Sequence, residues 1–184
     1  MTTTNQLREL ALQALTATTD AGARVYSPRD QATWDGEYPV IFVRTNDENG
    51  ESFGRNGAPA FTVTSTLLVE ARAQHGALPN DAGAAALQLI LEALRDQIKA
   101  AVINYPPLMA ELNQFSFFRT RITAGPEEAG EHLGAVTVEL GLEFVQGPED
   151  FFPVPTVPLT GVDVRIQEPD GTTVPGLTID LPQE

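Results

Sequence analysis

Hydrophobic residues recur with two different periods between Ala60 and Gln146. From Asn80 to Ile103 they recur every three to four residues, which predicts an amphipathic helix. The apolar side of this helix consists of Leu87, Ile90, Leu91, Leu94, Ile98, Ala101 and Val102, and its polar side of Gln88, Glu92, Arg95, Asp96 and Lys99. From Ala60 to Ala73 the period is two, which predicts a strand with Phe61, Val63, Leu67 and Val69 on one face. We expect this face to pack on the apolar side of the helix.

Several other segments read as strands. Gly134 to Val145 alternates between apolar and polar residues, and Phe115 to Ala124 begins with a crowded group of aromatic residues. A short strand is expected at Arg24–Tyr26. Pro39 to Thr45 is apolar on both faces, which places it centrally in a sheet. Strands near 13 residues would project past the domain and leave long open edges, where another chain can pair.

The remaining segments of this region read as a helix and two loops. Gln6 to Thr18 predicts a first helix, with Thr4 or Asn5 as its cap. Asn46 to Pro59 is expected to be a loop, and Gly125 to Gly130 an acidic turn. The predicted fold class is therefore α+β, with an antiparallel sheet of four to five strands and both helices packed on one face.

The character of the chain changes after Gly147-Pro148. Residues 151–158 are rich in proline and predict an extended arm. Val162–Gln167 and Val174–Asp180 then predict a β-hairpin around Asp170-Gly171. Because a lone hairpin is marginally stable in water, it should pair with something else. The sequence thus predicts an α+β domain over residues 1–148 and an arm with a hairpin over residues 149–184.

Composition narrows the class of partner. The chain has 184 residues, 42% of them hydrophobic, and a net charge of −14, with 25 acidic residues against ten Arg and one Lys. No Lys/Arg cluster is present, so neither sequence-specific nucleic-acid binding nor binding to an anionic membrane is expected. The chain has no Cys, its N-terminal residues do not resemble a signal peptide, and no apolar run reaches membrane-spanning length. A cytosolic protein is expected, with an acidic surface that favours solubility or repels an anionic partner.

The sequence offers little for nucleophilic or acid–base catalysis. The two histidines, His75 and His132, lie in polar, turn-like stretches, and no nucleophile motif precedes either one. The paired carboxylates Glu149 and Asp150 are best explained as solvated residues. The cluster of Phe115, Phe117 and Phe118, with Arg119 and Arg121 beside it, is expected to belong to the core. We therefore predict no catalytic residue and no enzymatic activity.

Metal and cofactor sites are not supported either. His132 beside Glu127, Glu128 and Glu131 lacks the spacing of a known metal motif. The segment from Thr45 to Gly50 superficially resembles a calcium loop, but Asn56 stands where a bidentate Glu is required. Gly54 to Gly57 lacks the Lys-Ser/Thr of a phosphate-binding loop and leads into a strand. We expect no metal and no cofactor.

The order of elements and several local phrases carry a resemblance to a known family. They are the helix Leu7–Leu15, the phrase Asp20–Tyr26, the strand Pro39–Val43 followed by Asp47-Glu48, the strand end Leu67–Ala71, and the helix Asp81–Ile98. Over residues 5–146 the chain resembles the tail-terminator (tail-completion) proteins of long-tailed bacteriophages. Their pattern contains no catalytic residue to carry over, and the segment from Glu149 to Glu184 goes beyond it.

The resemblance implies a small subunit that forms a homo-oligomeric ring, usually a hexamer. Such a ring stops growth of the tail tube and offers the surface where the filled head joins. It implies a structural virion protein of the tail–neck region, assembled in the cytoplasm of the bacterial host. The implied partners are other copies of the chain, the tail tube protein and a head-completion or neck protein, with DNA passing through the ring. The C-terminal arm leaves open a contact with a neighbouring subunit, a sheath protein or a head-side protein.

Eight residues are interface candidates within this interpretation. They are Asp47, Glu48, Glu51, Arg55, Phe151, Phe152, Val164 and Ile166. Two alternatives stay open. One is another neck or head-completion protein of the phage head–tail connector, and the other is a small-ligand or enzymatic α+β domain with a site that the sequence does not reveal.

Overall fold

The chain divides into two compact units. The computed structural model describes residues 2–28, 36–54, 59–128, 130–152, 160–169, 171 and 173–180. Unit 1 comprises Met1–Phe151 and unit 2 comprises Phe152–Glu184, a boundary three residues beyond the expected one. Each unit is described by itself.

Unit 1 is an α+β domain built on one five-stranded sheet. Its elements are α1 (Thr4–Leu15), β1 (Val25–Tyr26), β2 (Val40–Ser52), β3 (Phe61–Gly76), the 3₁₀ turn η1 (Pro79–Asp81), α2 (Ala82–Ile103), α3 (Pro106–Met109), β4 (Gln114–Glu128), β5 (Glu131–Gln146) and α4 (Pro148–Phe151). The strand order is β1-β2-β3-β5-β4. The α+β class and the strand number agree with the prediction.

The sheet is mixed rather than fully antiparallel, which corrects the prediction. β1 runs parallel to β2, with Val25 beside Ile41, whereas the pairs β2–β3, β3–β5 and β4–β5 are antiparallel. The backbone N–H of Ile41 donates to the carbonyl of Arg24 at 2.9 Å. A parallel pair needs a crossover of a dozen or more residues, and the chain between Tyr26 and Val40 is long enough to provide one.

The centre of the sheet is β3, which pairs with β2 on one side and with β5 on the other. Its odd-numbered residues from Val63 to Ala73 are buried, as the alternating pattern predicts. The even-numbered residues of β5 from Val136 to Phe144 are buried in the same core. We call the face that carries these residues the core face and the opposite one the outer face.

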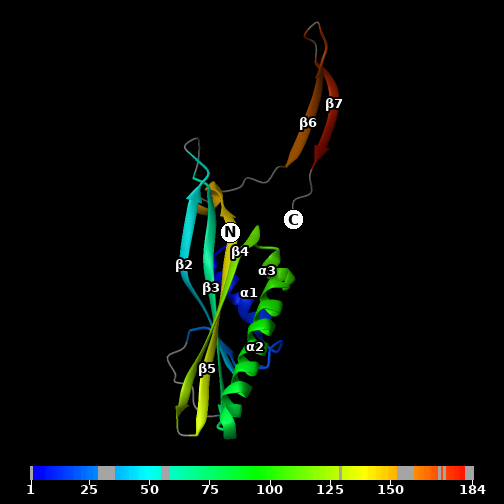
Figure 1. Cartoon of the computed structure of the whole chain (residues 1–184). Coiled ribbons are helices and arrows are strands. Elements are labelled where there is room, and N and C mark those ends of the chain that lie inside the picture. The colour runs from blue at the N-terminus through cyan, green and yellow to red at the C-terminus, as the bar shows by residue number, and fades with distance from the viewer. Residues whose placement is uncertain are drawn as a thin grey trace. The chain divides into compact units, whose positions relative to one another are not determined.

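Both long helices pack on the core face, which confirms the prediction. The buried residues of α1 and α2 belong to one hydrophobic cluster with those of β2, β3 and β5. Figure 1 shows α1 and α2 on the same side of the sheet. An ideal Cβ on Gly134 of β5 would lie 2.7 Å from Cδ1 of Leu91, so α2 packs so closely on the sheet that a side chain there would collide with it.

The helices begin and end at other residues than expected. α1 begins at Thr4 and is capped by Thr3, whose Oγ1 accepts from the backbone N–H of Gln6 at 3.2 Å. It ends at Leu15, because Thr16 is extended with ψ 126°, and Ala17 then adopts a positive φ of 61°. α2 begins at Ala82 rather than Asn80. The two residues before it, Asn80 and Asp81, are both left-handed, and Asn and Asp tolerate this conformation better than most residues.

The strands extend into segments that the sequence pattern assigns to loops. β2 continues through Asn46–Ser52, where Asp47 to Ser52 pair with Thr66 to Phe61 of β3 after a register shift at Asn46. β4 continues to Glu128 and β5 begins at Glu131, so the predicted acidic turn lies mostly in strands. Residues Asn46–Ser52 are all exposed, so backbone pairing with β3 rather than burial extends β2 there.

Unit 2 contains the predicted hairpin. β6 (Gly161–Gln167) and β7 (Thr173–Asp180) are antiparallel, with Val164 opposite Leu177. The connection between them is longer than the two-residue turn expected at Asp170-Gly171, since Gln167 pairs with Thr173. The predicted arm falls largely on residues 153–159, outside the described residues. Its expected first residue, Phe151, ends the short helix α4 instead.

A substitution at the centre of α2 tests the helix–sheet packing. Leu91 is fully buried. Leu91→Ala should therefore lower the free energy of unfolding by about 2–5 kcal/mol through lost burial and the cavity that remains. Leu89→Ala is the matched control, because Leu89 lies on the same helix with 68% of its surface exposed, and should change the value by no more than about 0.5 kcal/mol. Equal effects of the two substitutions in urea denaturation would contradict this packing.

Candidate functional site

The two histidines lie in strands and face each other, which corrects their expected position in loops. His75 of β3 is directly opposite His132 of β5, and both are half-buried. Nδ1 of His75 lies 2.8 Å from the carbonyl oxygen of Gly76. Cδ2 of His132 lies 3.0 Å from an ideal Cβ on Gly83, next to the start of α2. Among the residues that the structure describes, no three His, Asp or Glu side chains converge in a way that could hold a metal ion.

The acidic interface candidates of β2 point to different faces. Thr66 Oγ1 donates to Asp47 Oδ2 at 3.0 Å on the outer face. Glu48 is opposite the buried Ser65, on the core face, and its carboxylate accepts from the hydroxyl of Thr4 in α1. Glu51 is exposed and pairs in register with Thr62. Arg55 lies outside the described residues.

The apolar interface candidates are divided between the two units. The ring of Phe151 packs edge-on against that of Phe61, with centroids 5.6 Å apart, and belongs to unit 1. Phe152 is the first residue of unit 2 and is 66% exposed. Val164 and Ile166 lie in β6 and are exposed.

The hairpin of unit 2 has one apolar face. Val164 lies opposite Leu177, and a register shift between Val164 and Ile166 places the extra residue in β7. Residues of β6 that are two positions apart therefore point to the same face of the hairpin, because the shift adds no residue to this strand. The exposed apolar side chains of this face are Val162, Val164, Ile166, Leu177 and Ile179.

The aromatic cluster at the start of β4 does not form one core group, which corrects the prediction. A register shift at Ser116 lies between Phe115 and Phe117. Phe115 is partly buried and packs against the core, whereas Phe117 pairs with Gly141 on the outer face. Phe118 is 59% exposed, and Nζ of Lys99 lies 5.8 Å from its ring centroid.

The outer face is hollowed between β2 and β4. A hollow of about 490 Å³ is lined by Asn46, Asp47, Asn49, Thr64, Thr66, Leu68, Ser116, Phe117, Arg119 and Glu139. A second hollow of about 440 Å³ is lined by Arg119, Thr120, Arg121, Thr137 and Glu139. Hydroxyl, amide and charged groups dominate both linings, so this face is suited to hydrogen bonding with a polar partner.

Two exposed arginines mark this face along β4. Arg119 lies opposite Glu139 of β5, and its guanidinium lies 5.0 Å from the ring centroid of Phe117. Arg121 lies opposite Thr137. Neither arginine forms an ion pair with any side chain that the structure describes. Neither arginine was predicted as an interface residue, although their spacing of two already places them on one face of a strand.

Both borders of the sheet are open. β4 pairs only with β5, and beyond Phe42 β2 pairs only with β3. Within the described part of the chain, one side of Val43–Ser52 and one side of Gln114–Glu128 therefore carry backbone groups without a strand partner. Such edges are templates for pairing with another chain. Long open edges were expected from the lengths of the strands.

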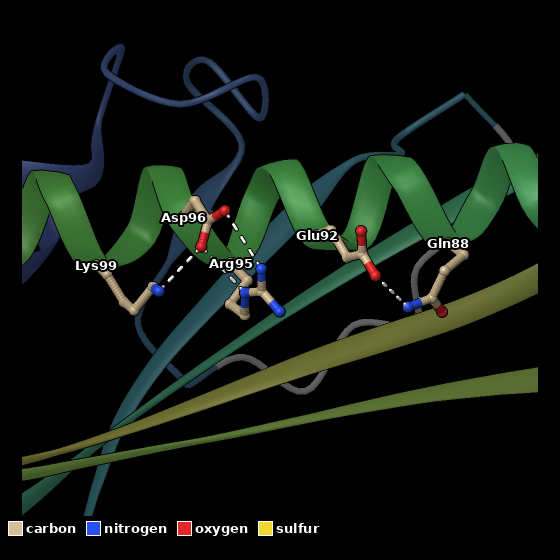
Figure 2. A network of polar contacts seen from close by, with 5 residues as sticks. All are labelled: Gln88, Glu92, Arg95, Asp96 and Lys99. Carbon is tan, nitrogen blue, oxygen red and sulfur yellow. Dashed lines mark hydrogen bonds and ion pairs between the residues drawn. The ribbon is translucent and has the colours of Figure 1, made fainter.

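A polar network runs along the exposed side of α2 (Figure 2). Arg95 donates to Asp96 through Nε at 3.0 Å and through Nη2 at 3.3 Å, and Nζ of Lys99 lies 2.9 Å from Oδ1 of Asp96. Hydrogen bonding from Arg95, and then from Lys99, lowers the pKa of Asp96 to about 2. The same bond raises the pKa of Arg95. One turn away, Gln88 donates to Glu92 at 2.7 Å. This network is a solvated set of neighbouring pairs, and such pairs add little stability.

The Asp96 carboxyl gives a pH-dependent test of the network. Its folded pKa lies below the ordinary 3.8, so its contribution is present above pH 3.8 and is lost as the pH falls through about 2. A titration of the carboxyl carbon by NMR should show a midpoint near pH 2. Arg95→Ala should move the midpoint upward more than Lys99→Ala does, whereas the control Gln88→Ala should leave it in place. An ordinary midpoint in the unmodified chain would contradict the network.

Comparison with known proteins does not identify a family. No helix in the described part of the chain is both long and apolar enough to cross a membrane. No family model matches the chain, and no curated protein matches it either.

Proposed function

We propose that this chain is a structural subunit of a phage tail, whose copies form a ring that caps the completed tail tube and provides the head-joining surface. The observation that carries the proposal is the single sheet of unit 1, which within the described residues has a long open stretch on each border, Val43–Ser52 of β2 beyond the short β1 and all of β4. The resemblance of residues 5–146 to tail-terminator proteins gives this self-association its biological setting.

The two open borders favour a ring over a two-fold dimer. β2 and β4 are different strands, so contact between β2 of one copy and β4 of the next is heterologous. A heterologous contact gives a closed ring when its rotation closes and an open filament when it does not. A closed ring has a fixed number of copies, because it leaves no free border for lateral addition, and a ring of fixed size can cap the end of a tube. Six copies are the number that the resemblance implies.

Unit 2 supports a role in assembly. Its hairpin has two strands and an apolar face of exposed Val, Ile and Leu side chains. An isolated two-stranded hairpin is marginally stable in water, and exposed apolar faces mark contact sites. A neighbouring copy, the tube, a neck protein or a sheath protein could each bind this face.

The proposed location is the tail–neck region of the virion, after assembly in the cytoplasm of the bacterial host. The net charge of −14 per copy is compatible with DNA passing through the ring without adhering to it. The same features fit another neck or head-completion protein, which makes that class the first alternative.

A ligand-binding role is the second alternative, and one observation favours it. The hollow of about 490 Å³ on the outer face has a polar lining with one aromatic ring, Phe117. It is large enough for a small polar molecule. Its position between the two open borders agrees equally well with a surface that becomes part of an assembly.

Tube capping is the direct test of the proposed function. The purified chain should form rings of one size in electron micrographs and in native mass spectra. Rings added to polymerising tube subunits from the same genome should bind tube ends and stop elongation. Rings that bind head-side proteins and ignore tube ends would instead support the neck-protein alternative. A monomer that turns over or tightly binds a metabolite would overturn the proposal.

Ionic strength should control assembly. Six copies at −14 each carry about −84 in total, so copies repel one another at low salt. The Debye length falls from about 30 Å at 0.01 M salt to about 8 Å at 0.15 M, which screens this long-range repulsion while leaving close contacts less affected. Sedimentation should therefore show more ring at 0.15 M than at 0.01 M. Assembly that weakens over this range would contradict the expectation.

A further inference from the structure

Segments of opposite charge lie on the two open borders of the sheet, and Glu127 and Glu128 of β4 follow its basic segment only after the register shift beyond Ala124. The border segment of β4 from Gln114 to Gly125 contains Arg119 and Arg121 and no acidic residue. The border segment of β2 from Val43 to Ser52 contains three acidic residues and Arg44. We infer that copies of this chain join by pairing β4 of one copy with β2 of the next, with the two arginines of β4 against Asp47 and Glu51. The inference rests on the proposed ring and specifies its interface.

The strand directions fix how the two borders meet. β2 is antiparallel to β3, β3 to β5, and β5 to β4. β2 and β4 of one copy therefore run in opposite directions. When the sheet of one copy continues into the sheet of the next, β4 therefore pairs with β2 in an antiparallel manner. The other long strands of this sheet pair in the same way.

The charged side chains lie on the same face of that continued sheet. Arg119 and Arg121 pair in register with Glu139 and Thr137, on the outer face. On β2, Asp47 and Glu51 pair with Thr66 and Thr62, whose even numbers place them on the outer face of β3. Side chains on one face of neighbouring strands interact when they are directly opposite or diagonal, and opposite charges there are stabilising.

Arg119 and Arg121 of β4 are the two cations, among the arginines and lysine that the structure describes, that lack a polar partner. Among the side chains that the structure describes, all other cations contact a carboxylate or a carbonyl oxygen. These are Arg8, Arg24, Arg44, Arg72, Arg95, Lys99 and Arg165. Arg119 contacts only the face of Phe117. In a chain of net charge −14, two cations left over at an open strand indicate an acidic surface as their partner.

The outward-facing side chains of β2 provide an acidic surface that can pair with these two arginines. Arg44 is already paired with Glu70 at 3.2 Å, so its charge is balanced within the copy. Glu48 points to the core face and accepts from Thr4. Asp47 uses one carboxylate oxygen for Thr66, and Glu51 forms no ion pair with the described side chains. The outer face of this border is therefore acidic.

The regular stretches of the two borders are of comparable length. Register shifts bound the stretch Phe117–Ala124 in β4, and one shift precedes Asp47–Ser52 in β2. Arg119 and Arg121 lie within the first stretch, and Asp47 and Glu51 within the second. Two antiparallel registers bring the charges together. With Arg119 opposite Asn49, Arg121 lies opposite Asp47; with Arg119 opposite Glu51, Arg121 lies opposite Asn49. In both registers each arginine is opposite or diagonal to a carboxylate.

Charge reversal on each border tests the inference. One variant is Arg119→Glu/Arg121→Glu, which makes both borders acidic. The other is Asp47→Arg/Glu51→Arg, which makes both borders basic. Each variant alone should assemble at least about 100-fold more weakly than the unmodified chain, because like charges would meet at every contact. An equimolar mixture should form rings again, because acidic and basic borders then alternate.

Native mass spectrometry measures the outcome, since the two variants differ in mass. The expected species is a ring that contains the variants in equal numbers. The control Arg95→Glu/Lys99→Glu makes the same change in net charge as Arg119→Glu/Arg121→Glu, but on α2, which packs on the core face and not on the outer face where the arginines of β4 lie. It should assemble like the unmodified chain. Circular dichroism of every variant confirms that it is folded.

The possible results separate the interface from the proposed function. Two results would overturn the β4–β2 pairing. One is that either variant forms rings alone, and the other is that an equimolar mixture of the folded variants forms no rings. Both would leave a tail-terminating ring in place. Assemblies that obey the charge rules but do not cap tubes would support the pairing and overturn the function. An unmodified chain that stays monomeric would overturn both.

Discussion

The unbroken pairing of β3 with β5 is the constraint on which the rest of unit 1 depends. The two strands stay in register from Phe61 opposite Gln146 to Gly76 opposite Glu131. Because side chains alternate between faces, a slip of one residue would turn Leu67 and Val69 toward water and break the contact with α2. The same register sets the outer face, so it also decides which polar residues of the sheet lie together.

The parts of the fold that bury a face could be predicted from the sequence. The alternation in β3 and β5 and the helical period of α2 are direct consequences of burying one side of each element, and they gave the correct faces. The second half of β2 could not be predicted, because Asn46–Ser52 is exposed and is held in the sheet by backbone pairing with β3. His75 and His132 were placed in loops for the same reason, since the polar ends of long strands resemble turns. The parallel pairing of β1 depends on a contact across a crossover, which a two-residue strand does not encode.

The candidate surfaces were only partly visible in the sequence. Asp47, Glu51 and the hairpin residues could be selected from charge and apolar character. Which face each residue takes depends on the register shift at Asn46, which sends Asp47 and Glu48 to opposite faces. The outward position of Arg119 and Arg121 could not be predicted, because they follow an aromatic cluster whose pattern is typical of a core. The shift at Ser116 divides that cluster and turns Phe117 and both arginines outward.

The register shifts of the border strands have a consequence for the behaviour of the chain in a cell. Long, flat, regular edges recruit any extended peptide and seed fibrils, and bulges are one of the devices by which natural sheets prevent this. Here β2 is interrupted at Asn46, and β4 is interrupted at Ser116 and again between Ala124 and Glu127. Only short regular stretches remain, which makes both borders poor templates for cross-β growth. Each border can therefore accept one short, specific strand partner, whereas open-ended fibril growth along it is disfavoured.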